Sequence, residues 1–397
     1  MSTHALQKGL ERLSFPALLA TAAAGLLALA AVGQDDGQQY RVIDQAALGI
    51  ADKHVHSWID RSPDGRTLAA SGTSASPLLI LDANDLSVLR RIDIGDWKVG
   101  TRVTHSRNGK YLLLEAIEYL PYSPRGKNER RFAVVEHATG QLVVNDVKAY
   151  AAEINAEEET LYFVGKDGVQ MLHIASGAIQ KAPGLVREAT ALALSPDGRH
   201  IALAYDPAEE DLARIPSIRN DKKVIKAALK IGQVVHVHDL SSGAFLFSVQ
   251  ELFDRAFRLR YSTDGRELWI HAKPASHKSA NPDVTLSYVD VADPGTGVMQ
   301  RASFPSHAIY EPTFCANGDN TRFAIGSQKG WRLEVHLYDR TNGSMAGRFI
   351  LDERLFSKLK EQGEKWSDQR VGFALLPDGK RMLMTMGSRL IEWTYAP

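Results

Sequence analysis

Two histidine pairs are the residues whose spacing first suggests chemistry. His54 and His56 are separated by one residue, as are His236 and His238. In a β-strand, residues i and i+2 point to the same side, so each pair could offer two imidazoles to one metal ion. Two ligands are too few, and no acidic third ligand follows at a fixed spacing. We therefore predict no metal site, and a structural role for His236 and His238.

Motifs for self-contained catalysis are absent from the sequence. It has no G-x-S-x-G nucleophile elbow, no C-x-x-C-H haem site, and no P-loop or G-x-G-x-x-G after a strand. The one cysteine, Cys315, excludes an internal disulfide and a cysteine-cluster zinc site. It precedes a polar turn, and we predict a small buried residue rather than a nucleophile. We expect no cofactor.

Charge and the N-terminus limit the class of protein. The chain has 47 Lys and Arg and 47 Asp and Glu, so it lacks the basic field that nucleic-acid binding needs.

Lys8 and Arg12 precede an uncharged apolar run at 15–32, which a polar acidic segment follows. This order predicts a secretory signal at 1–33, cleaved before Gln34 or Ala31. An uncleaved membrane anchor is the alternative, because the run is nearly long enough to span a bilayer. In either case we expect a periplasmic or secreted protein.

A polar turn that leads into an apolar strand is repeated along the chain. Pro presets the backbone for such a turn, Asp bonds the backbone ahead of it, and Gly accepts positive φ. A second repeated corner has a polar residue followed by small-polar-Gly, as in Asp239–Gly243 and Asp339–Gly343. The seven copies of the first turn begin at Ser62, Ser106, Asn155, Ser195, Ser262, Ala316 and Leu376.

The strands between these turns are continuously apolar, as in "PLLILD" and "IALAY". A strand that is buried on both faces has this pattern. Each repeat is therefore predicted to be a small antiparallel sheet with a neighbouring sheet on either side. Sheets repeated in this way predict an all-β, seven-bladed β-propeller of four-stranded blades over residues 39–397.

The "SPDGR" turns and the "D-x-x-[ST]-G" corners resemble those of the bacterial WD-repeat-like and YVTN-type β-propellers. The resemblance covers residues 40 to 397, although the WD dipeptide and the usual Gly-His pair are absent. It implies the propeller fold and hardly restricts function, since such propellers include binding proteins and several kinds of enzyme.

Closure of the ring can be predicted from the two ends of the chain. The last repeat has a turn at 377–379 and strands near residues 381–386 and 390–395, and the chain then ends one strand short of a complete blade. The segment "QYRVIDQ" at 39–45 has strand character and precedes the first repeat. We predict that it pairs with the C-terminal strand and becomes the outer strand of the seventh blade.

The insertions that interrupt the repeat all fall in links on the same face of the disc. If the strands of a blade are named a to d from the inside outwards, the repeated turns join a to b and c to d. The b–c and d–a links open on the opposite face of the disc. That face carries insertions at 118–131, 206–232, 273–283 and 352–370. Insertions that cluster on one face commonly mark a binding face.

Arg and His are frequent where the innermost strands are expected to begin, around the channel mouth. Such a mouth would suit an anionic group. The alternative is that these side chains pair with nearby carboxylates such as Glu188 and Glu311. The candidate ligand-binding residues are His54, His56, Trp97, Arg102, Arg187, Arg258, His307, Tyr310, Glu311 and Arg370.

Two functional hypotheses follow. The first is an exported, non-catalytic propeller that binds a protein partner or a small anionic ligand through the insertion-bearing face. The second is a propeller enzyme, such as a lactonase-like hydrolase or a dehydrogenase subunit, with its site at the channel mouth. The glutamate, asparagine and aspartate positions of propeller lactonases have no identifiable counterparts in this sequence.

Overall fold

The repeated polar turns form as their chemistry requires. Ser62 Oγ accepts a hydrogen bond from the backbone N–H of Thr67 and donates one to Asp64. Gly65 has a φ of 73°, in the left-handed region that glycine enters at no steric cost. The same side-chain contacts recur at Ser195 with Asp197 and at Ser262 with Asp264.

The structure is a computed structural model, and it describes fourteen segments of the chain. These are residues 32–35, 38–44, 56–72, 77–95, 100–117, 127–155, 157–274, 286–307, 314–316, 321–329, 332–351, 372–376, 378–386 and 389–395.

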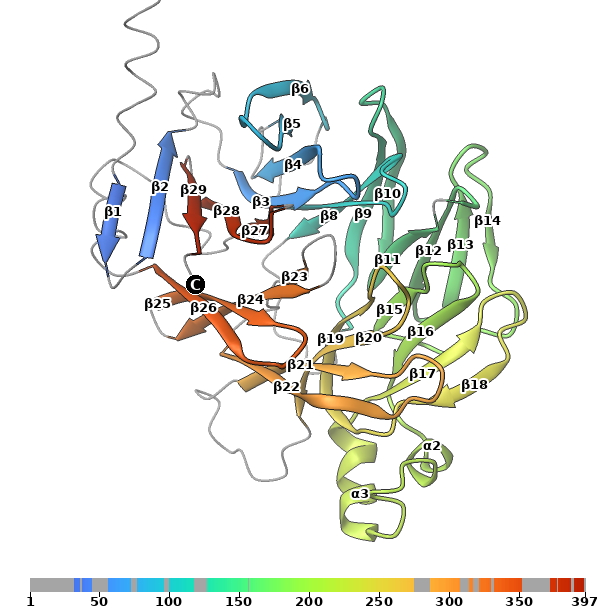
Figure 1. The fold of residues 1–397 in the computed structure, drawn as a ribbon. Helices are drawn as coiled ribbons and strands as arrows, with labels where there is room; N and C mark the ends of the chain where they lie inside the picture. Colours follow the sequence, from blue (N-terminus) through green and yellow to red (C-terminus); the bar gives the residue numbers. More distant parts are fainter. Residues whose placement is uncertain are drawn as a thin grey trace, which may run out of the picture.

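Seven antiparallel sheets follow one another around a ring, which confirms the predicted seven-bladed β-propeller (Figure 1). Blade one contains β3 (His56–Arg61), β4 (Thr67–Gly72), β5 (Leu78–Asp82) and β6 (Val88–Ile92). Blade two contains β7 (Gly100–His105), β8 (Tyr111–Ile117), β9 (Arg130–Glu136) and β10 (Leu142–Ala149). Blade three contains β11 (Ala151–Asn155), β12 (Thr160–Gly165), β13 (Gly168–His173) and β14 (Ile179–Lys181).

The remaining blades repeat this arrangement. Blade four contains β15 (Ala191–Leu194), β16 (His200–Tyr205), β17 (Val234–Asp239) and β18 (Phe245–Ser248). Blade five contains β19 (Phe253–Tyr261), β20 (Leu268–Pro274), β21 (Leu286–Ala292) and β22 (Met299–His307). Blade six contains β23 (Phe314–Ala316), β24 (Arg322–Lys329), β25 (Arg332–Asp339) and β26 (Met345–Leu351). Blade seven contains β27 (Gly372–Leu375), β28 (Arg381–Met386), β29 (Arg389–Thr394), β2 (Gln38–Asp44) and β1 (Val32–Asp35).

Each interface between neighbouring blades holds an apolar cluster, seven in all among the described residues. Strand β16 shows why these strands are continuously apolar. Ile201, Leu203 and Tyr205 belong to the cluster shared with blade three. Ala202 and Ala204 belong to the cluster shared with blade five. Successive side chains point to opposite faces of the sheet, and both faces are buried.

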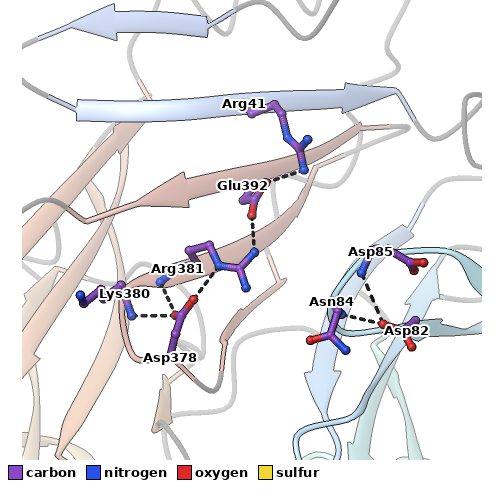
Figure 2. A network of polar contacts seen from close by, with 8 residues as sticks. All are labelled: Arg41, Asp82, Asn84, Asp85, Asp378, Lys380, Arg381 and Glu392. Carbon is purple, nitrogen blue, oxygen red and sulfur yellow. Dashed lines mark hydrogen bonds and ion pairs between the residues drawn. The ribbon is translucent and has the colours of Figure 1, made fainter. Parts of the chain in front are cut away.

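The ring closes as predicted, because β2 pairs antiparallel with β29 from Gln39 opposite Thr394 to Asp44 opposite Arg389. A charged network reinforces the closure, as Figure 2 shows. Glu392 lies 2.6 Å from Arg41 of β2 and 3.0 Å from Arg381 of β28. One carboxylate therefore holds together the first and the last parts of the ring.

A fifth strand on blade seven was not predicted. β1 pairs with the outer edge of β2, with Asp35 opposite Gln38. Two residues, Asp36 and Gly37, separate the strands. Asp-Gly is a favourable sequence for a two-residue hairpin, so a local signal for this strand was present. β1 overlaps the end of the predicted signal segment.

The fold separates two faces of the disc. We call the face with the a–b and c–d turns the turn face, and the face with the b–c and d–a links the insertion face. The insertion after β16 contains α2 (Glu209–Ala213) and α3 (Lys222–Ile231), which lie together beside blades four and five (Figure 1). Among the described residues, no helix is long and apolar enough to cross a bilayer.

Candidate functional site

The structure describes the side chains of three candidate ligand-binding residues. Arg102 lies near the start of β7, as predicted. Arg258 lies in the middle of β19 rather than at its start, because that strand already begins at Phe253. Arg187 lies in the link that leads from β14 to β15.

The other candidates are placed only in part or not at all. His56 begins β3, the inner strand of blade one. His307 ends β22, the outer strand of blade five, because this strand extends further than the sequence suggested; it does not begin the inner strand of blade six. The side chains of both histidines lie outside the described part. His54, Trp97, Tyr310, Glu311 and Arg370 lie outside the described residues altogether.

Arg102 and Arg258 meet at a carboxylate that sequence reasoning missed. Glu115 of β8 lies directly opposite Arg102 of β7 in the register of blade two. Arg102 donates a hydrogen bond of 2.9 Å to Glu115 Oε2, and Arg258 donates one of 3.3 Å to the same oxygen. Arg130, the first residue of β9, donates to Oε1. Blades two and five are three positions apart in the ring, so Arg258 reaches Glu115 across the channel.

Burial and charge act against each other at Glu115. Burial favours the neutral acid, but the charges of Arg102 and Arg130 and their hydrogen bonds outweigh it and lower the pKa of Glu115 below its ordinary value. The Arg102 side chain is only 6% exposed, and its guanidinium lies 4.2 Å from the centre of the Trp58 ring. The Arg258 side chain is 27% exposed. Glu115 is therefore ionised at neutral pH, and Arg258 is more exposed than Arg102.

Arg187 belongs to a second polar cluster, on the insertion face. It lies 2.8 Å from Asp211 of α2 and 4.6 Å from the centre of the Tyr205 ring. Glu188, one of the carboxylates that were considered as partners for the channel residues, accepts hydrogen bonds from Lys127 at 2.5 Å and from Tyr150 at 3.1 Å.

Lys127 joins two insertions across the intervening blade. It lies at the end of the blade-two insertion and contacts Glu188, which leads into blade four. It also lies 2.9 Å from Asp206, the first residue of the blade-four insertion. Burial acts to lower the pKa of Lys127, but its hydrogen bonds to these two carboxylates raise it. Lys127 thus links the described end of the blade-two insertion to the start of the blade-four insertion.

The blade-four insertion is docked through one apolar face. Asp221 begins α3 by accepting hydrogen bonds from the backbone of Lys223 and Val224. One face of α3 packs on the cluster between blades three and four, through Val224, Ile225, Ala228 and Leu229. The opposite face is exposed and basic, and consists of Lys222, Lys223, Lys226 and Lys230.

Asp211 fixes the other helix of the insertion. The residue is 1% exposed, accepts a hydrogen bond from the backbone of Ala208, and lies 3.5 Å from His236 Nε2. Burial lowers the pKa of His236 to about 4, against the opposing effect of Asp211. His236 and His238 lie on β17, the third strand of blade four. This placement supports the structural role predicted for them.

At the turn face, one position of the inner strand links neighbouring blades. Asp60 of β3 accepts a hydrogen bond from the backbone N–H of His105 in the next blade at 2.7 Å. Glu153 of β11 accepts one from the backbone N–H of Leu194 at 2.9 Å. Cys315 of β23 does the same with Leu375. Asp60 and Glu153 each lie two residues before the first residue of their a–b turn, Ser62 and Asn155, whereas Cys315 directly precedes Ala316. The shared position of the two carboxylates is the signal that could have identified them.

At the turn face, one side chain of blade two also reaches past blade three to blade four. Arg107, in the a–b turn of blade two, donates a hydrogen bond of 2.8 Å to the carbonyl of Leu194 in blade four. Its guanidinium lies 3.7 Å from Glu153. Among the described residues, no group of three His, Cys, Asp or Glu side chains could hold a metal ion.

Comparisons with known proteins support the fold. No protein-family model matches the chain, and no curated protein sequence matches it. The β-propeller domain of Myceliophteria thermophila Cps50 (Swd1) is similar in structure, with 13% identity and a TM-score of 0.55 over 87% of this chain and 98% of that one. Kuenenia stuttgartiensis hydrazine synthase has 15% identity and a TM-score of 0.50 over 83% of this chain and 92% of that one. The chain shares a propeller fold with both.

Proposed function

We propose that this protein is a non-catalytic binding propeller whose insertion face receives a partner molecule. The observation that carries the proposal is the contact of Lys127, at the described end of the blade-two insertion, with Glu188 and with Asp206, where the blade-four insertion begins. The turn face, in contrast, has short turns that repeat the same internal hydrogen bonds. Loops that depart from a repeated scaffold are where such folds acquire binding sites.

The proposed place of action is outside the cytoplasm. This part of the proposal is supported by the sequence of residues 1–33, in which a basic start, an apolar run and a polar segment follow one another. The "SPDGR" turns also support a relationship to the exported WD-repeat-like and YVTN-type propellers.

Site-specific photo-crosslinking in the native host tests the proposal. A photoreactive residue replaces Lys226 on the exposed side of α3, and a matched control replaces Arg199 on the turn face, which is also exposed. We expect discrete crosslinked products from position 226 and none from position 199. Products from position 199 alone, or identical products from both positions, would contradict binding through the insertion face.

A further inference from the structure

The charges of the blade-four insertion are separated along its sequence. Its first residues, 206–211, include four carboxylates, whereas residues 212–231 contain six Lys and Arg and a single acidic residue, Asp221. The whole chain has equal numbers of basic Lys and Arg and of acidic Asp and Glu. The excess of positive charge is therefore a property of this segment and not of the protein as a whole.

Helix α3 gathers four of these cations on one face. Lys222, Lys226 and Lys230 follow one another at intervals of four residues, and Lys223 lies beside them, since residues three and four apart are neighbours on a helix. All four lysines are exposed. The apolar residues of the opposite side pack on the cluster between blades three and four, so that the lysines are held outwards. We call these four lysines the basic face of α3.

The basic face acts against the stability of its own helix. Lys222 and Lys223 are the first two residues of α3, where the helix dipole already carries partial positive charge. Lys226 lies four residues from both Lys222 and Lys230, a spacing at which like charges repel each other. The helix contains no acidic residue that would offset these effects. Exposed residues that break local rules in this way are expected at functional positions.

The basic face lacks carboxylate partners within the protein. Asp221, which begins α3, accepts hydrogen bonds of 2.9 and 3.0 Å from the backbone of the first helical turn. Asp206 and Asp211 pair with cations outside the helix. Within the part of the chain that the structure describes, the lysines at 222, 223 and 226 form no ion pair. Lys230 takes part in a further interaction, so these three lysines are the ones available to a partner.

We propose that the basic face of α3 binds an acidic segment of a partner protein, in which several carboxylates lie close together. Lysines are compact charges that pair with carboxylates without a preformed pocket, and their field speeds up the encounter. An anionic membrane is a poorer match, because the apolar side of α3, by which an amphipathic helix enters a bilayer, is buried against the blades. The inference rests on the proposed function and names the chemistry of the partner.

Binding of an acidic peptide tests the charge of this face. The probe is fluorescein-labelled polyglutamate, whose fluorescence anisotropy is followed as the full chain is added. We expect binding that weakens as salt is raised, because charges in solvent are screened. In the lysine variant, which combines Lys222→Gln, Lys223→Gln and Lys226→Gln, we expect an affinity about tenfold or more lower. The three changes leave the apolar side of the helix intact, so the variant should fold.

The matched control removes three cations from the turn face, through Arg66→Gln, Arg199→Gln and Arg266→Gln. These arginines are also exposed, and the change in net charge is the same. We expect the control variant to bind the peptide as the wild type does. An equal loss in the two variants would show that net charge alone attracts the peptide, and would overturn the inference.

Vesicles of phosphatidylglycerol and phosphatidylethanolamine test the alternative partner. We expect the lysine variant and the wild type to bind these vesicles equally. If the vesicles bind the wild type, the lysine variant loses this binding and the peptide binds neither, the basic face contacts a membrane and the acidic protein partner is wrong.

Photo-crosslinking in the native host separates this inference from the proposed function. A photoreactive residue replaces Asn220, an exposed residue just before the helix, in the wild type and in the lysine variant. We expect a discrete product in the wild type and a yield about tenfold lower in the variant. The same yield in both would refute the inference and leave binding through the insertion face intact. No product from positions 220 and 226 of the wild type would refute the proposed function, and the inference with it.

Discussion

Arg258 of blade five lies 3.3 Å from the carboxylate of Glu115 in blade two, on the opposite side of the central channel. These residues are 143 positions apart in the chain. The contact joins two blades that share no sheet and no common interface. It therefore adds a link through the centre of the ring to those made between neighbouring blades.

A double-mutant cycle measures this link. We expect Arg258→Gln, Glu115→Gln and the double variant to give a coupling free energy of roughly 0.5–3 kcal/mol in urea unfolding. The pair is part-buried and hydrogen-bonded, so solvent screens it only in part. The control cycle combines Arg258→Gln with Glu392→Gln, which lies in the closure network of blade seven. Strict additivity of the Arg258 and Glu115 variants would show that the contact across the channel contributes nothing to stability.

Ring closure through β2 predicts that two N-terminal truncations differ clearly in their free energy of unfolding. A chain that begins at Gln38 keeps β2 and all six pairs from Gln39–Thr394 to Asp44–Arg389. A chain that begins at Gln45 loses them, together with the contact of Arg41 with Glu392. We expect the second truncation to lose on the order of 3–6 kcal/mol of unfolding free energy, because about six hydrogen bonds and the cover of β29 are removed. Equal denaturation midpoints for the two chains would rule out a stabilising role for β2.

The buried His236 should make the folded protein less stable as the pH falls. Its pKa is lowered by burial to about 4 in the folded protein, against an ordinary value of 6.5, while Asp211 opposes the shift and Arg187, His238 and Arg214 add to it. The folded state therefore binds fewer protons than the unfolded state between these values. The stability that His236 contributes is complete above pH 6.5 and is lost as the pH falls towards 4.

Replacing His236 with Gln should therefore flatten the rise of stability with pH in this window, by at most about 1.4 kcal/mol per pH unit. Unfolding free energies measured in guanidinium across the window provide the comparison. Tyr205→Phe is the matched control, since Tyr205 contacts His236 within the same interface but has a pKa raised far above the window. If the His236 variant keeps the slope of the wild type, the histidine does not titrate as the structure indicates.

Cys315 should be unreactive in the folded protein. Cys315 is half-buried rather than fully buried, but the loss of solvent around its sulfur raises the pKa of the thiol to about 12, and the sulfur accepts a hydrogen bond from the backbone of Leu375. Little thiolate is present at mildly alkaline pH, and the thiolate is the nucleophile. We expect a disulfide reagent such as dithionitrobenzoate to react with the guanidinium-unfolded chain and hardly at all with the native one. Rapid reaction of the native protein would contradict this placement.

The architecture could be predicted because its signals are local. A turn such as Ser62–Gly65 specifies its own geometry within a few residues, and repetition of the turn specifies the ring. The spacing of Val224, Ile225, Ala228 and Leu229 is likewise a local signal, because it places these residues on one face of a helix, and this is the face that packs on the blades. The closure by β2 followed from counting strands in the last repeat.

The partners of the channel residues could not be predicted, because the ring brings together residues with no local relationship. Nothing near Arg258 in the sequence points to Glu115, and the carboxylate beside Arg187, Glu188, proved to be the partner of Lys127. Asp211, the actual partner of Arg187, is buried by the fold of its own insertion. Such pairings depend on the angle between blades and on the path of an insertion.

The pairing of β2 with β29 also affects when the ring can form. Of the strands in the closing blade, β2 is translated long before β29, and every other blade lies between them in the sequence. β2 must therefore remain without its final partner until residues 389–394 are delivered. A chain that is interrupted anywhere before this point lacks the strand that pairs with β2 and cannot close the ring. The ring can therefore close only after the strands of all seven blades have been synthesised.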